Sequence, residues 1–406
     1  MKASAIGITI FLLSPTQLYC AAMERSDQSI TAFLEKDNYF EISIAQLNAE
    51  ISGQMPQHAA LKTLQVQDFS TGNLANNYLF SNVVLKLQPS AHYSIGLIYD
   101  QPFGIDLAYN YRPDSLLGKQ NLESAKLKIQ TQNLTLLTGF QPDQNWNFYT
   151  GLSYQTLKGE INLYGLSYSF LSGYNADIEE DAALGWLTGI RFQIPELALK
   201  TSLTYRSAIQ HTPQINETLS NVPLAFTANM PTKIQSPQSI NLDVQIGLTP
   251  NNLAYSAVRW VNWKTYAIQP TQFAAIIEDA ARQYPDLIQE FNLIDYRENQ
   301  ISAKLGLAHR LMDRWVTTSD ISWDSGSGNL ATPLNPANGF WVLGLGLLYN
   351  YNLKTESYMG LGLNYFKFNQ ANISNDSLVS ANQIAQLSEV QNNHALAYGV
   401  RLAHHF

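Results

Sequence analysis

The residues best suited to covalent chemistry are few and are poorly placed for it. Ser325 lies in the segment 324–328, DSGSG, and a nucleophilic serine on a strand-to-helix turn needs a helix directly after it. No helical spacing follows this segment. Three histidines near the chain end lack the spacing of metal ligands, namely His394, His404 and His405. We therefore predict no catalytic site, no metal and no cofactor. Hydrolysis of a phospholipid or a peptide that depends on Ser325 and His309 would establish the alternative, a hydrolytic enzyme.

The elements that must position the polar side chains are strands, and the chain end shows their pattern most clearly. Within 394–406, one parity carries Leu396, Tyr398, Val400, Leu402 and Phe406, and the other carries Ala397, Gly399, Arg401, Ala403 and His405. Successive side chains of a strand point to opposite faces, so one face is apolar and the other carries small and charged groups. In an outer-membrane barrel the apolar face contacts lipid. A chain that ends on an aromatic residue here resembles the terminal strand of Gram-negative outer-membrane proteins, so Phe406 is the predicted contact with the barrel assembly machinery.

Residues 1–22 have the organisation of an export signal. A positive start, a short apolar stretch and small residues before a cleavage point are provided by Lys2, Ala5 to Leu13, Cys20 and Ala22. The apolar stretch is too short to cross a bilayer as a helix. If cleavage follows Ala22, the single cysteine leaves with the signal and the mature chain has no disulfide. The predicted domains are the signal peptide 1–22, a short periplasmic or plug segment 23–37 and an outer-membrane barrel 38–406.

The composition favours a lipid-facing sheet over a soluble domain. Charged residues make up only 14% of the chain, whereas soluble domains contain about 25%. The chain is rich in aromatic residues, with 22 Tyr, 17 Phe and 7 Trp, and no apolar segment after residue 22 is long enough for a membrane helix. The net charge of −8 argues against nucleic acid as a partner. Outer-membrane lipids, and detergents after extraction, are the predicted surroundings.

Alternating segments recur along the whole chain and predict fourteen strands, the even number that single-chain bacterial barrels require. The predicted strands are 38–51, 77–88, 92–109, 123–138, 145–163, 184–194, 197–210, 236–248, 253–267, 296–310, 315–325, 339–350, 357–367 and 393–406. Six connections are short and rich in turn residues, as periplasmic turns are, and seven are longer, as outward loops are. A soluble sandwich also alternates, but its strands are usually shorter. We predict an all-β, fourteen-stranded antiparallel transmembrane barrel in the outer membrane of a Gram-negative cell, acting as a monomer.

Three long connections carry unusual residues. Segments 164–183 and 211–235 place apolar side chains in loops that face water, namely Tyr168, Phe170, Leu171, Tyr174, Val222, Leu224, Phe226 and Met230. Such a patch marks a binding surface, unless its members pack on one another and close the barrel mouth. Segment 271–292 has helical spacing of apolar residues before Pro285, which predicts a short amphipathic helix over a loop.

The chain resembles the FadL family of outer-membrane transporters for long-chain fatty acids and other hydrophobic compounds. The resemblance spans nearly the whole chain after the signal and is carried by IGLIYDQPFG (95–104), LSYQTLKGEINL (152–163), ALKTSLTYRSAI (198–209), INLDVQIGLTPNNLAYSAVRWVNWK (240–264), ISWDSGSG (321–328) and NHALAYGVRLAHHF (393–406). The family fold is a fourteen-stranded barrel. Family members have a longer N-terminal plug with an Asn-Pro-Ala motif, which is absent from 23–37, so a plug-dependent gate is not expected here.

The resemblance implies a route for the ligand. A groove between the outer loops captures a hydrophobic molecule, which passes to a tighter internal site and leaves sideways through a gap made by a kink in the third strand. The sequence of the third strand is consistent with such a kink. The alternation of apolar and polar residues in 92–109 breaks at Asp100, Gln101, Pro102, Phe103 and Gly104. Proline cannot donate to the sheet ladder and glycine often marks a bulge or bend. An ordinary bulge without a passage is the alternative.

A fatty carboxylate in an apolar lumen needs a cation. By parity Lys158, Arg206, Lys200, Arg191 and Arg401 point inward, and Arg297 begins a strand near the family's basic headgroup contact. We therefore predict Lys158, Arg206 and Arg297 as headgroup contacts. The alternative is an internal ladder of salt bridges with Glu160, Asp243, Asp320 or Asp324.

The sequence therefore predicts passive uptake of long-chain fatty acids or similar hydrophobic molecules. The alternative is a general porin, or a surface receptor without specificity for hydrophobic ligands. A porin lines its constriction with opposed charges and gives large ion conductance, and the apolar loops 164–183 and 211–235 argue against it.

Overall fold

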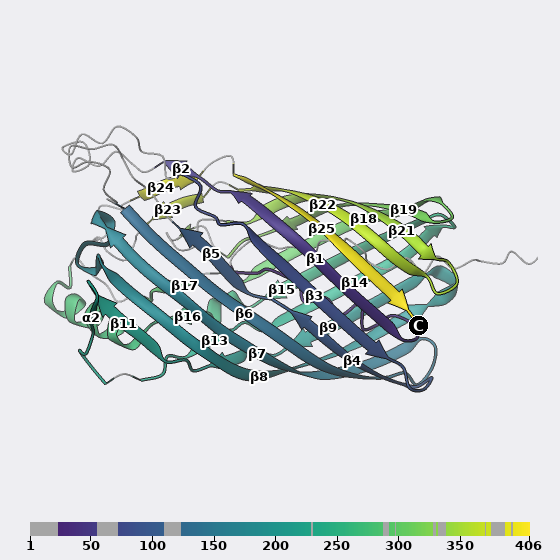
Figure 1. Ribbon diagram of the computed structural model, residues 1–406, viewed down its shortest axis with the longest axis horizontal. Coiled ribbons are helices and arrows are strands. Elements are labelled where there is room, and N and C mark those ends of the chain that lie inside the picture. Colours follow the sequence, from purple (N-terminus) through teal and green to yellow (C-terminus); the bar gives the residue numbers. More distant parts are fainter. Residues whose placement is uncertain are drawn as a thin grey trace, which may run out of the picture.

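Alternating polarity along the chain produces long antiparallel strands, which wrap into a barrel in the computed structural model (Figure 1). The structure describes residues 23–54, 72–108, 123–228, 230–286, 292–296, 298–327, 330–331, 338–369, 371–374, 386–390 and 393–406. The predicted export signal, 1–22, lies outside these residues, and so does Arg297.

The wall contains fourteen strands, the third of which is divided into β4 and β5. In chain order they are β1 (Tyr39–Glu50), β3 (Tyr78–Leu87), β4 (Tyr93–Asp100) with β5 (Gly104–Ala108), β6 (Glu123–Phe140), β7 (Trp146–Gly165), β8 (Tyr174–Ile194), β9 (Leu199–Arg206), β14 (Ser239–Thr249), β15 (Asn252–Val261), β18 (Gln300–Met312), β19 (Trp315–Asp324), β21 (Phe340–Asn352), β22 (Ser357–Phe368) and β25 (His394–His405).

The first and last strands close the cylinder. β1 pairs with β25 along its whole length, from Tyr39 opposite His405 to Glu50 opposite His394, and its other edge pairs with β3. Closure leaves no long open edge for another chain to pair with. The prediction of an all-β, fourteen-stranded antiparallel barrel is confirmed.

The outer surface carries a continuous apolar band. On β25 the alternate side chains Leu396, Tyr398, Val400 and Leu402 are exposed, while Ala395, Ala397 and Ala403 face inward and are buried. Leucines on β18, β21 and β22 continue this band around the barrel. A closed sheet with an apolar outer face and polar groups inside has the construction of an outer-membrane barrel. Among the described helices, none has the length and apolar character needed to cross a bilayer.

The outer face of the barrel changes from apolar to charged along β6 and β7. On β6, Leu134 and Leu136 are exposed in the apolar band, but farther along the same face stand Lys126 and Lys128. Ala125, Leu127 and Ile129 on the opposite face are buried inside the barrel. The upper parts of these strands therefore project from the membrane into water and enclose an apolar interior. The rule that apolar side chains face outward reverses above the membrane.

This reversal explains why the start of β8 was predicted wrongly. We expected a loop over 164–183, but a 3-10 helix, η1 (Leu166–Leu171), is followed at once by β8, which begins at Tyr174. Its register with β7 shifts between Leu157 and Gly159, which marks a bulge. Apolar residues face inward and acidic residues outward along the first part of β8, so the expected pattern of a lipid-facing strand is absent there.

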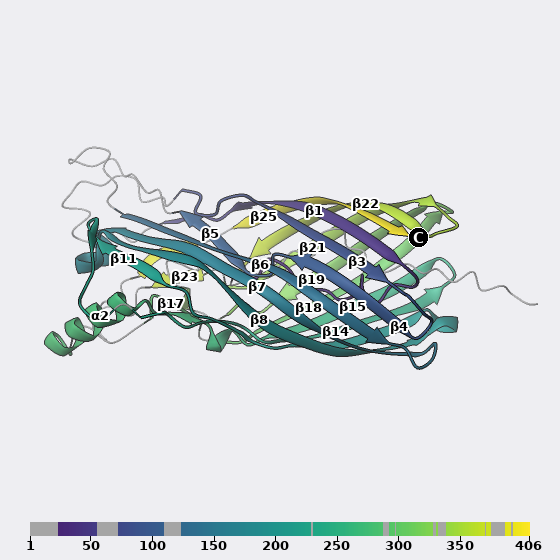
Figure 2. The same ribbon diagram turned by 60° about the horizontal axis from the view of Figure 1, so that its bottom comes forward.

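Short elements cover the extracellular end, opposite the short turns (Figures 1 and 2). The predicted helix is confirmed as α2 (Thr271–Gln283), which ends before Pro285. The remaining elements are β2 (Gly53–Gln54), η2 (Pro195–Leu197), β10 (Ile209–His211), β11 (Ile215–Leu219), β12 (Val222–Pro223), β13 (Ile234–Ser236), η3 (Trp263–Thr265), β16 (Ala267–Ile268), β17 (Ile294–Asp295), β20 (Leu330–Ala331), β23 (Ala371–Ser374) and β24 (Gln386–Val390).

Candidate functional site: an apolar chamber beside a gap in the wall

The third strand carries one residue more than its neighbour at the predicted kink. Asp100 pairs with Asn133 of β6 and Gly104 pairs with Gln130, so three residues of the third strand stand opposite two of β6. Pro102 has no N–H for the ladder. Its carbonyl accepts hydrogen bonds from chain segment 23–37 instead, at 2.8 Å from the Arg25 N–H and 3.3 Å from the Ser26 N–H.

The extra residue separates the third strand from β3. β4 pairs with β3 only over 83–87, and β5 pairs with β6 alone among the barrel strands. Residues 78–82 of β3 therefore have no strand partner on this side within the described structure. Above them, the Asn76 N–H donates to the Asp106 carbonyl at 3.1 Å and the Ala108 N–H donates to the Leu74 carbonyl at 2.9 Å. We call this framed gap, between 78–82 and β5, the window.

Groups from inside the barrel lie against the window. The Arg25 guanidinium lies 4.5 Å from the centre of the Tyr78 ring. A Cβ atom at Gly104 would lie 2.6 Å from this guanidinium and 2.7 Å from the Ile129 carbonyl oxygen, so only glycine fits here. A cavity of about 70 Å³ lies between segment 23–37, β1 and β3, and Gln101 and Asp100 are among its polar lining. Phe103 turns inward and is buried.

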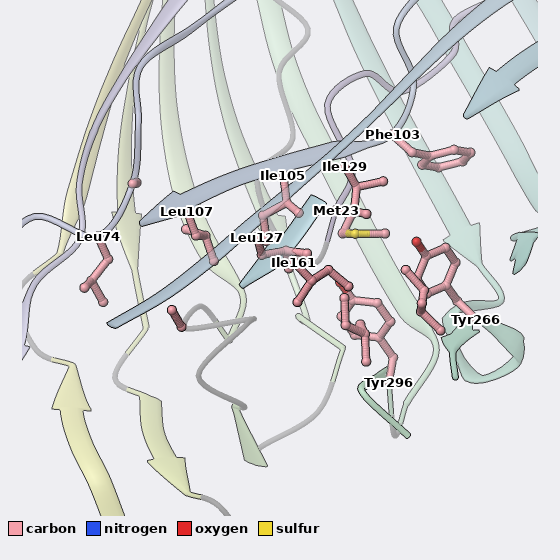
Figure 3. Packing of buried hydrophobic residues seen from close by; sticks show 14 of the residues in the cluster. Met23, Leu74, Phe103, Ile105, Leu107, Leu127, Ile129, Ile161, Tyr266 and Tyr296 are labelled. Carbon is pink, nitrogen blue, oxygen red and sulfur yellow. The ribbon is translucent and has the colours of Figure 1, made fainter. Parts of the chain in front are cut away.

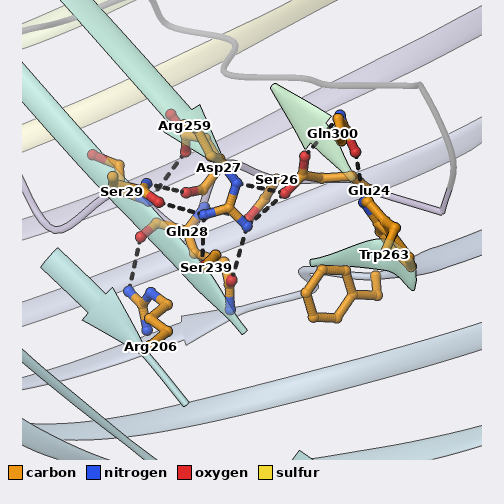
Figure 4. A network of polar contacts seen from close by, with 12 residues as sticks. Glu24, Ser26, Asp27, Gln28, Ser29, Arg206, Ser239, Arg259, Trp263 and Gln300 are labelled. Carbon is orange, nitrogen blue, oxygen red and sulfur yellow. Dashed lines mark hydrogen bonds and ion pairs between the residues drawn. The ribbon is translucent and has the colours of Figure 1, made fainter. Parts of the chain in front are cut away.

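Segment 23–37 fills the lumen below the window with a buried polar network (Figure 4). The Glu24 carboxylate accepts a hydrogen bond from Arg259 Nε at 2.6 Å and another from Gln300 Nε2 at 3.2 Å. Arg259 also donates to Asn241, at 2.5 Å, and to the Gln28 side chain, at 3.1 Å. Because Glu24 and Arg259 are both buried, each charge depends on the other.

The same segment continues to the periplasmic end of the barrel. The Leu34 carbonyl accepts a hydrogen bond from Arg191 at 2.6 Å, and the Glu35 carboxylate lies 3.3 Å from Nε2 of His405. Burial raises the pKa of Glu35 to about 7, although His405 and Lys200 act in the opposite direction. Segment 23–37 is short, yet it spans the lumen from the window to the chain end.

Above the window the interior is apolar. The side chains of Leu127, Ile129, Ile161 and Phe103 belong to one buried cluster, which also includes Met23 (Figure 3). Aromatic rings extend this cluster: the Trp263 ring lies 5.5 Å from Phe103, 5.5 Å from Tyr266 and 4.9 Å from Tyr296. We call this region the upper chamber. It ends at the window, where the polar network begins.

Two of the three predicted headgroup contacts, Lys158 and Arg206, are not brought together, and Arg297 lies outside the described residues. Lys158 was expected to point inward, which is wrong: it is half exposed on the outer face and pairs with Glu180 at 2.9 Å. Its neighbour Leu157 points inward and is buried, because the polarity of the faces is reversed above the membrane. Arg206 does point inward, but its guanidinium donates to the Gln28 carbonyl at 2.8 Å.

The other inward cations and acids are distributed through the lower lumen. Arg401 Nε lies 3.5 Å from a Glu41 oxygen, and Ser202 donates to Asp243 at 3.3 Å. Asp324 accepts a short hydrogen bond from Gln300, at 2.5 Å. Glu160 pairs with Lys126 on the outside of the barrel. Inward ion pairs are therefore formed by Glu41 and Glu24, whereas Asp243 and Asp324 accept hydrogen bonds from neutral side chains and Glu160 lies outside.

The eight residues predicted for a groove in the outer loops fall into two groups. Tyr168, Leu171 and Tyr174 are buried in the cluster of the upper chamber, and Leu224 packs against it. Four side chains are exposed, namely Phe170, Val222, Phe226 and Met230. The buried residues pack on one another and close the barrel mouth, which was the alternative to a binding groove. The four exposed residues leave apolar surface in contact with water.

The residues considered for catalysis make structural contacts. The Ser325 hydroxyl donates to the Gly326 carbonyl at 2.9 Å and accepts the Ile301 N–H at 3.0 Å. His309 Nδ1 lies 2.7 Å from the Asn252 side-chain oxygen. Within the described ranges, no group of three or more His, Cys, Asp or Glu side chains is arranged to hold a metal.

Several residues of this site were not predicted. Arg259 lies between the outward residues Val258 and Trp260, so the parity of β15 already indicated an inward cation. Tyr266 and Tyr296 fell inside the predicted strands 253–267 and 296–310, but β15 ends at Val261 and β18 begins at Gln300, so parity gives no direction for these side chains. Glu24 precedes the first strand, where no periodicity applies.

No family model and no curated protein sequence matches the chain. Solved structures match along nearly its whole length. A FadL homologue of Pseudomonas aeruginosa has a TM-score of 0.67 at 11% identity, covering 97% of this chain and 96% of that one. The P. putida toluene transporter TodX has a TM-score of 0.60 at 10% identity, covering 92% and 91%. The Ralstonia pickettii toluene transporter TbuX has a TM-score of 0.56 at 11% identity, covering 97% of each chain. The chain therefore has the fold of the FadL family, as the sequence predicted.

Proposed function

We propose that this barrel mediates passive uptake of hydrophobic small molecules across the outer membrane, with release through the window into the lipid. The observation that carries the proposal is the position of the window, at the level where the apolar upper chamber meets the buried polar network. A hydrophobic molecule that moves sideways from the chamber passes the Tyr78 ring and the Arg25 guanidinium over it, whereas below it meets the buried pair of Glu24 and Arg259.

Energetics favour the sideways route. A passage straight down would require the ligand to displace hydrogen bonds around Glu24 and Arg259, which are both buried. Separating a buried ion pair costs about 3–5 kcal/mol. Transfer through the window to the acyl chains of the membrane passes Arg25 and the polar lining of the small cavity, but it needs no such separation and ends in apolar surroundings.

Entry would begin at the exposed apolar residues of the outer loops, Val222, Phe226, Met230 and Phe170. The loop that carries Phe226 is fixed to α2, because the Phe226 and Thr227 N–H groups both donate to the Gln272 side chain, at 2.8 and 3.1 Å. An ordered apolar patch of this kind suits capture of a hydrophobic molecule from water. Its substrates would be long-chain fatty acids or monoaromatic hydrocarbons, since the structural neighbours are a FadL homologue and toluene transporters.

The register of the third strand defines the best test. Deletion of Pro102 alone removes the one extra residue relative to β6 and leaves Phe103 opposite Thr131. β5 can then pair with 78–82 and close the window. The Pro102→Ala variant is the matched control, because it keeps the extra residue and therefore the window. We expect the deletion to abolish uptake of radiolabelled oleate or toluene by cells, while Pro102→Ala retains it.

Folding must be followed in the same experiment. The migration of unheated protein in an electrophoresis gel reports a closed barrel, and the deletion variant should migrate like the wild type. Full uptake by a folded deletion variant would contradict release through the window. Large ion conductance in planar bilayers together with no uptake of either compound would favour a porin instead.

A further inference from the structure

Two buried hydroxyl groups in the upper chamber have no hydrogen-bond partner in the described part of the chain. They belong to Tyr266 and Tyr296, whose side chains are 2% and 6% exposed. Their rings lie 5.8 Å apart, and both contact Trp263. In Figure 3 the Tyr266 hydroxyl points to the side of the cluster where Met23 and Phe103 lie.

Other buried tyrosines of this chain have partners. Tyr174 donates to Glu217 at 2.8 Å, Tyr39 donates to Glu41 at 2.6 Å, and the Tyr149 hydroxyl lies 2.7 Å from that of Thr204. A buried tyrosine hydroxyl usually finds such a partner, because an unmade hydrogen bond in an apolar place is costly. Two orphan hydroxyls on neighbouring rings indicate that their acceptor comes from outside the chain.

The charges around Tyr266 and Tyr296 indicate which kind of hydrogen-bond acceptor the two hydroxyl groups would bind. Burial alone raises the pKa of Tyr266, and burial together with the Tyr266 ring and the Asp295 carboxylate raises the pKa of Tyr296. Both groups therefore stay protonated and donate. The nearby Glu24 and Arg259 are already paired with each other. A carboxylate here would be repelled by the Asp295 carboxylate, and a neutral acceptor avoids this repulsion.

We propose that Tyr266 and Tyr296 form a donor pair for a neutral hydrogen-bond acceptor carried by a hydrophobic molecule, such as a ketone, an aldehyde, an ester or an undissociated carboxylic acid. This inference rests on the proposed function and specifies its substrate class. The rings of Trp263 and Phe103 contact the same cluster, so the oxygen of the ligand is held inside the chamber next to the window. An alkane of equal length fills the same space but leaves both hydroxyls unpaired.

The test compares 2-undecanone with undecane, which differ by one carbonyl group. Binding of each labelled compound to the purified full-length protein in detergent is measured for the wild type, Tyr266→Phe, Tyr296→Phe and the double variant. Phenylalanine keeps the ring in the cluster and removes only the hydroxyl. Tyr39→Phe is the control, because Tyr39 lies outside this apolar cluster and its hydroxyl donates to Glu41. The infrared carbonyl stretch of bound 2-undecanone reports the hydrogen bond directly.

We expect the wild type to bind 2-undecanone more tightly than undecane, and each variant of the pair to lose about three- to tenfold for the ketone alone. The carbonyl stretch should lie at lower wavenumber in the wild type than in the double variant, and Tyr39→Phe should behave like the wild type. Equal affinities of the wild type for the two compounds, or unchanged ketone binding in the double variant, would overturn the donor pair. Equal losses of affinity for the ketone and the alkane in the variants would also overturn the donor pair. If the wild type binds neither compound, the donor pair is overturned, and uptake of oleate or toluene by cells tests the proposed function separately.

Discussion

At the scale of residues, the ion pair between Glu24 and Arg259 holds segment 23–37 in the barrel. Both side chains are buried, with 0% and 3% exposed, and Arg259 makes further hydrogen bonds to Asn241 and Gln28. A buried pair contributes little net stability against apolar residues of equal volume, but the loss of one partner leaves an uncompensated charge. Parity within β15 predicted the direction of Arg259, whereas nothing in the sequence placed Glu24 opposite it.

Glu24→Gln should therefore destabilise the barrel by about 3–5 kcal/mol, because Arg259 is left charged and buried. The measurement is urea-induced unfolding in detergent. The control is Glu278→Gln, which removes a surface pair with Arg282 whose side chains are 57% and 69% exposed, and which should change stability by less than about 0.5 kcal/mol. Equal effects of the two substitutions would show that segment 23–37 is not anchored by this pair.

Glu35 should make stability depend on pH. Its pKa is raised by burial from 4.5 to about 7, so the folded protein binds a proton that the unfolded chain releases between these values. The stabilising contribution of protonated Glu35 to the folded state is thus fully present below pH 4.5 and is lost as the pH rises through about 7. It amounts to something on the order of 3 kcal/mol. The difference in thermal unfolding between wild type and Glu35→Gln, measured from pH 4.5 to 8, should follow this course; a flat difference would refute it.

At the scale of elements, α2 lacks an N-cap of its own, and another segment supplies one. Pro270 precedes the helix and offers no side-chain acceptor. The Glu217 carboxylate, on β11, accepts the N–H groups of Gln272 and Phe273 at 2.8 and 2.6 Å. The helix is therefore fixed to the hairpin that carries the exposed apolar residues. Its spacing predicted a helix, but the sequence could not predict a cap that lies 55 residues away.

Removal of this cap should loosen α2 and leave the barrel intact. Glu217→Ala should cost about 1–2 kcal/mol of local stability, since two N–H groups at the helix start lose their acceptor. Limited proteolysis with trypsin should then cut faster after Arg282, with no change in the electrophoretic migration of the unheated barrel. A cleavage rate equal to that of the wild type would show that α2 is held by other contacts.

The last strand makes a separate prediction, about assembly. We propose that the end of β25, with Phe406, is the part that the barrel assembly machinery reads, since Phe406 is exposed beyond the strand. Phe406→Ala should lower the amount of barrel in the outer membrane several-fold. The thermal stability of the assembled fraction should stay the same. Leu402→Ala, on the same outer face, is the control and should assemble normally. Equal yields of the two variants would contradict this role.

At the scale of the whole molecule, the sequence predicted the barrel well because lipid on one side and the lumen on the other impose strict alternation. All fourteen strands, their order and the interruption near Pro102 follow from this pattern. The alternation fails where the wall rises out of the membrane, which is why Lys158 and the start of β8 were placed wrongly. The contents of the lumen could not be predicted either, because segment 23–37 has no regular period and β15 ends at Val261, before Tyr266, although the strand was predicted to reach residue 267.

The central claim is that ligand leaves through the window, and a photoreactive residue at its edge tests this most directly. Leu79 faces outward on the unpaired part of β3 and is exposed, and Leu361 faces outward on β22. With p-benzoylphenylalanine at position 79, illumination during oleate or toluene uptake should cross-link the ligand. Position 361 should give only the background from lipid, and deletion of Pro102 should reduce the signal at position 79 to that background. Equal labelling at 79 and 361, or labelling at 79 that survives the deletion, would contradict exit through the window.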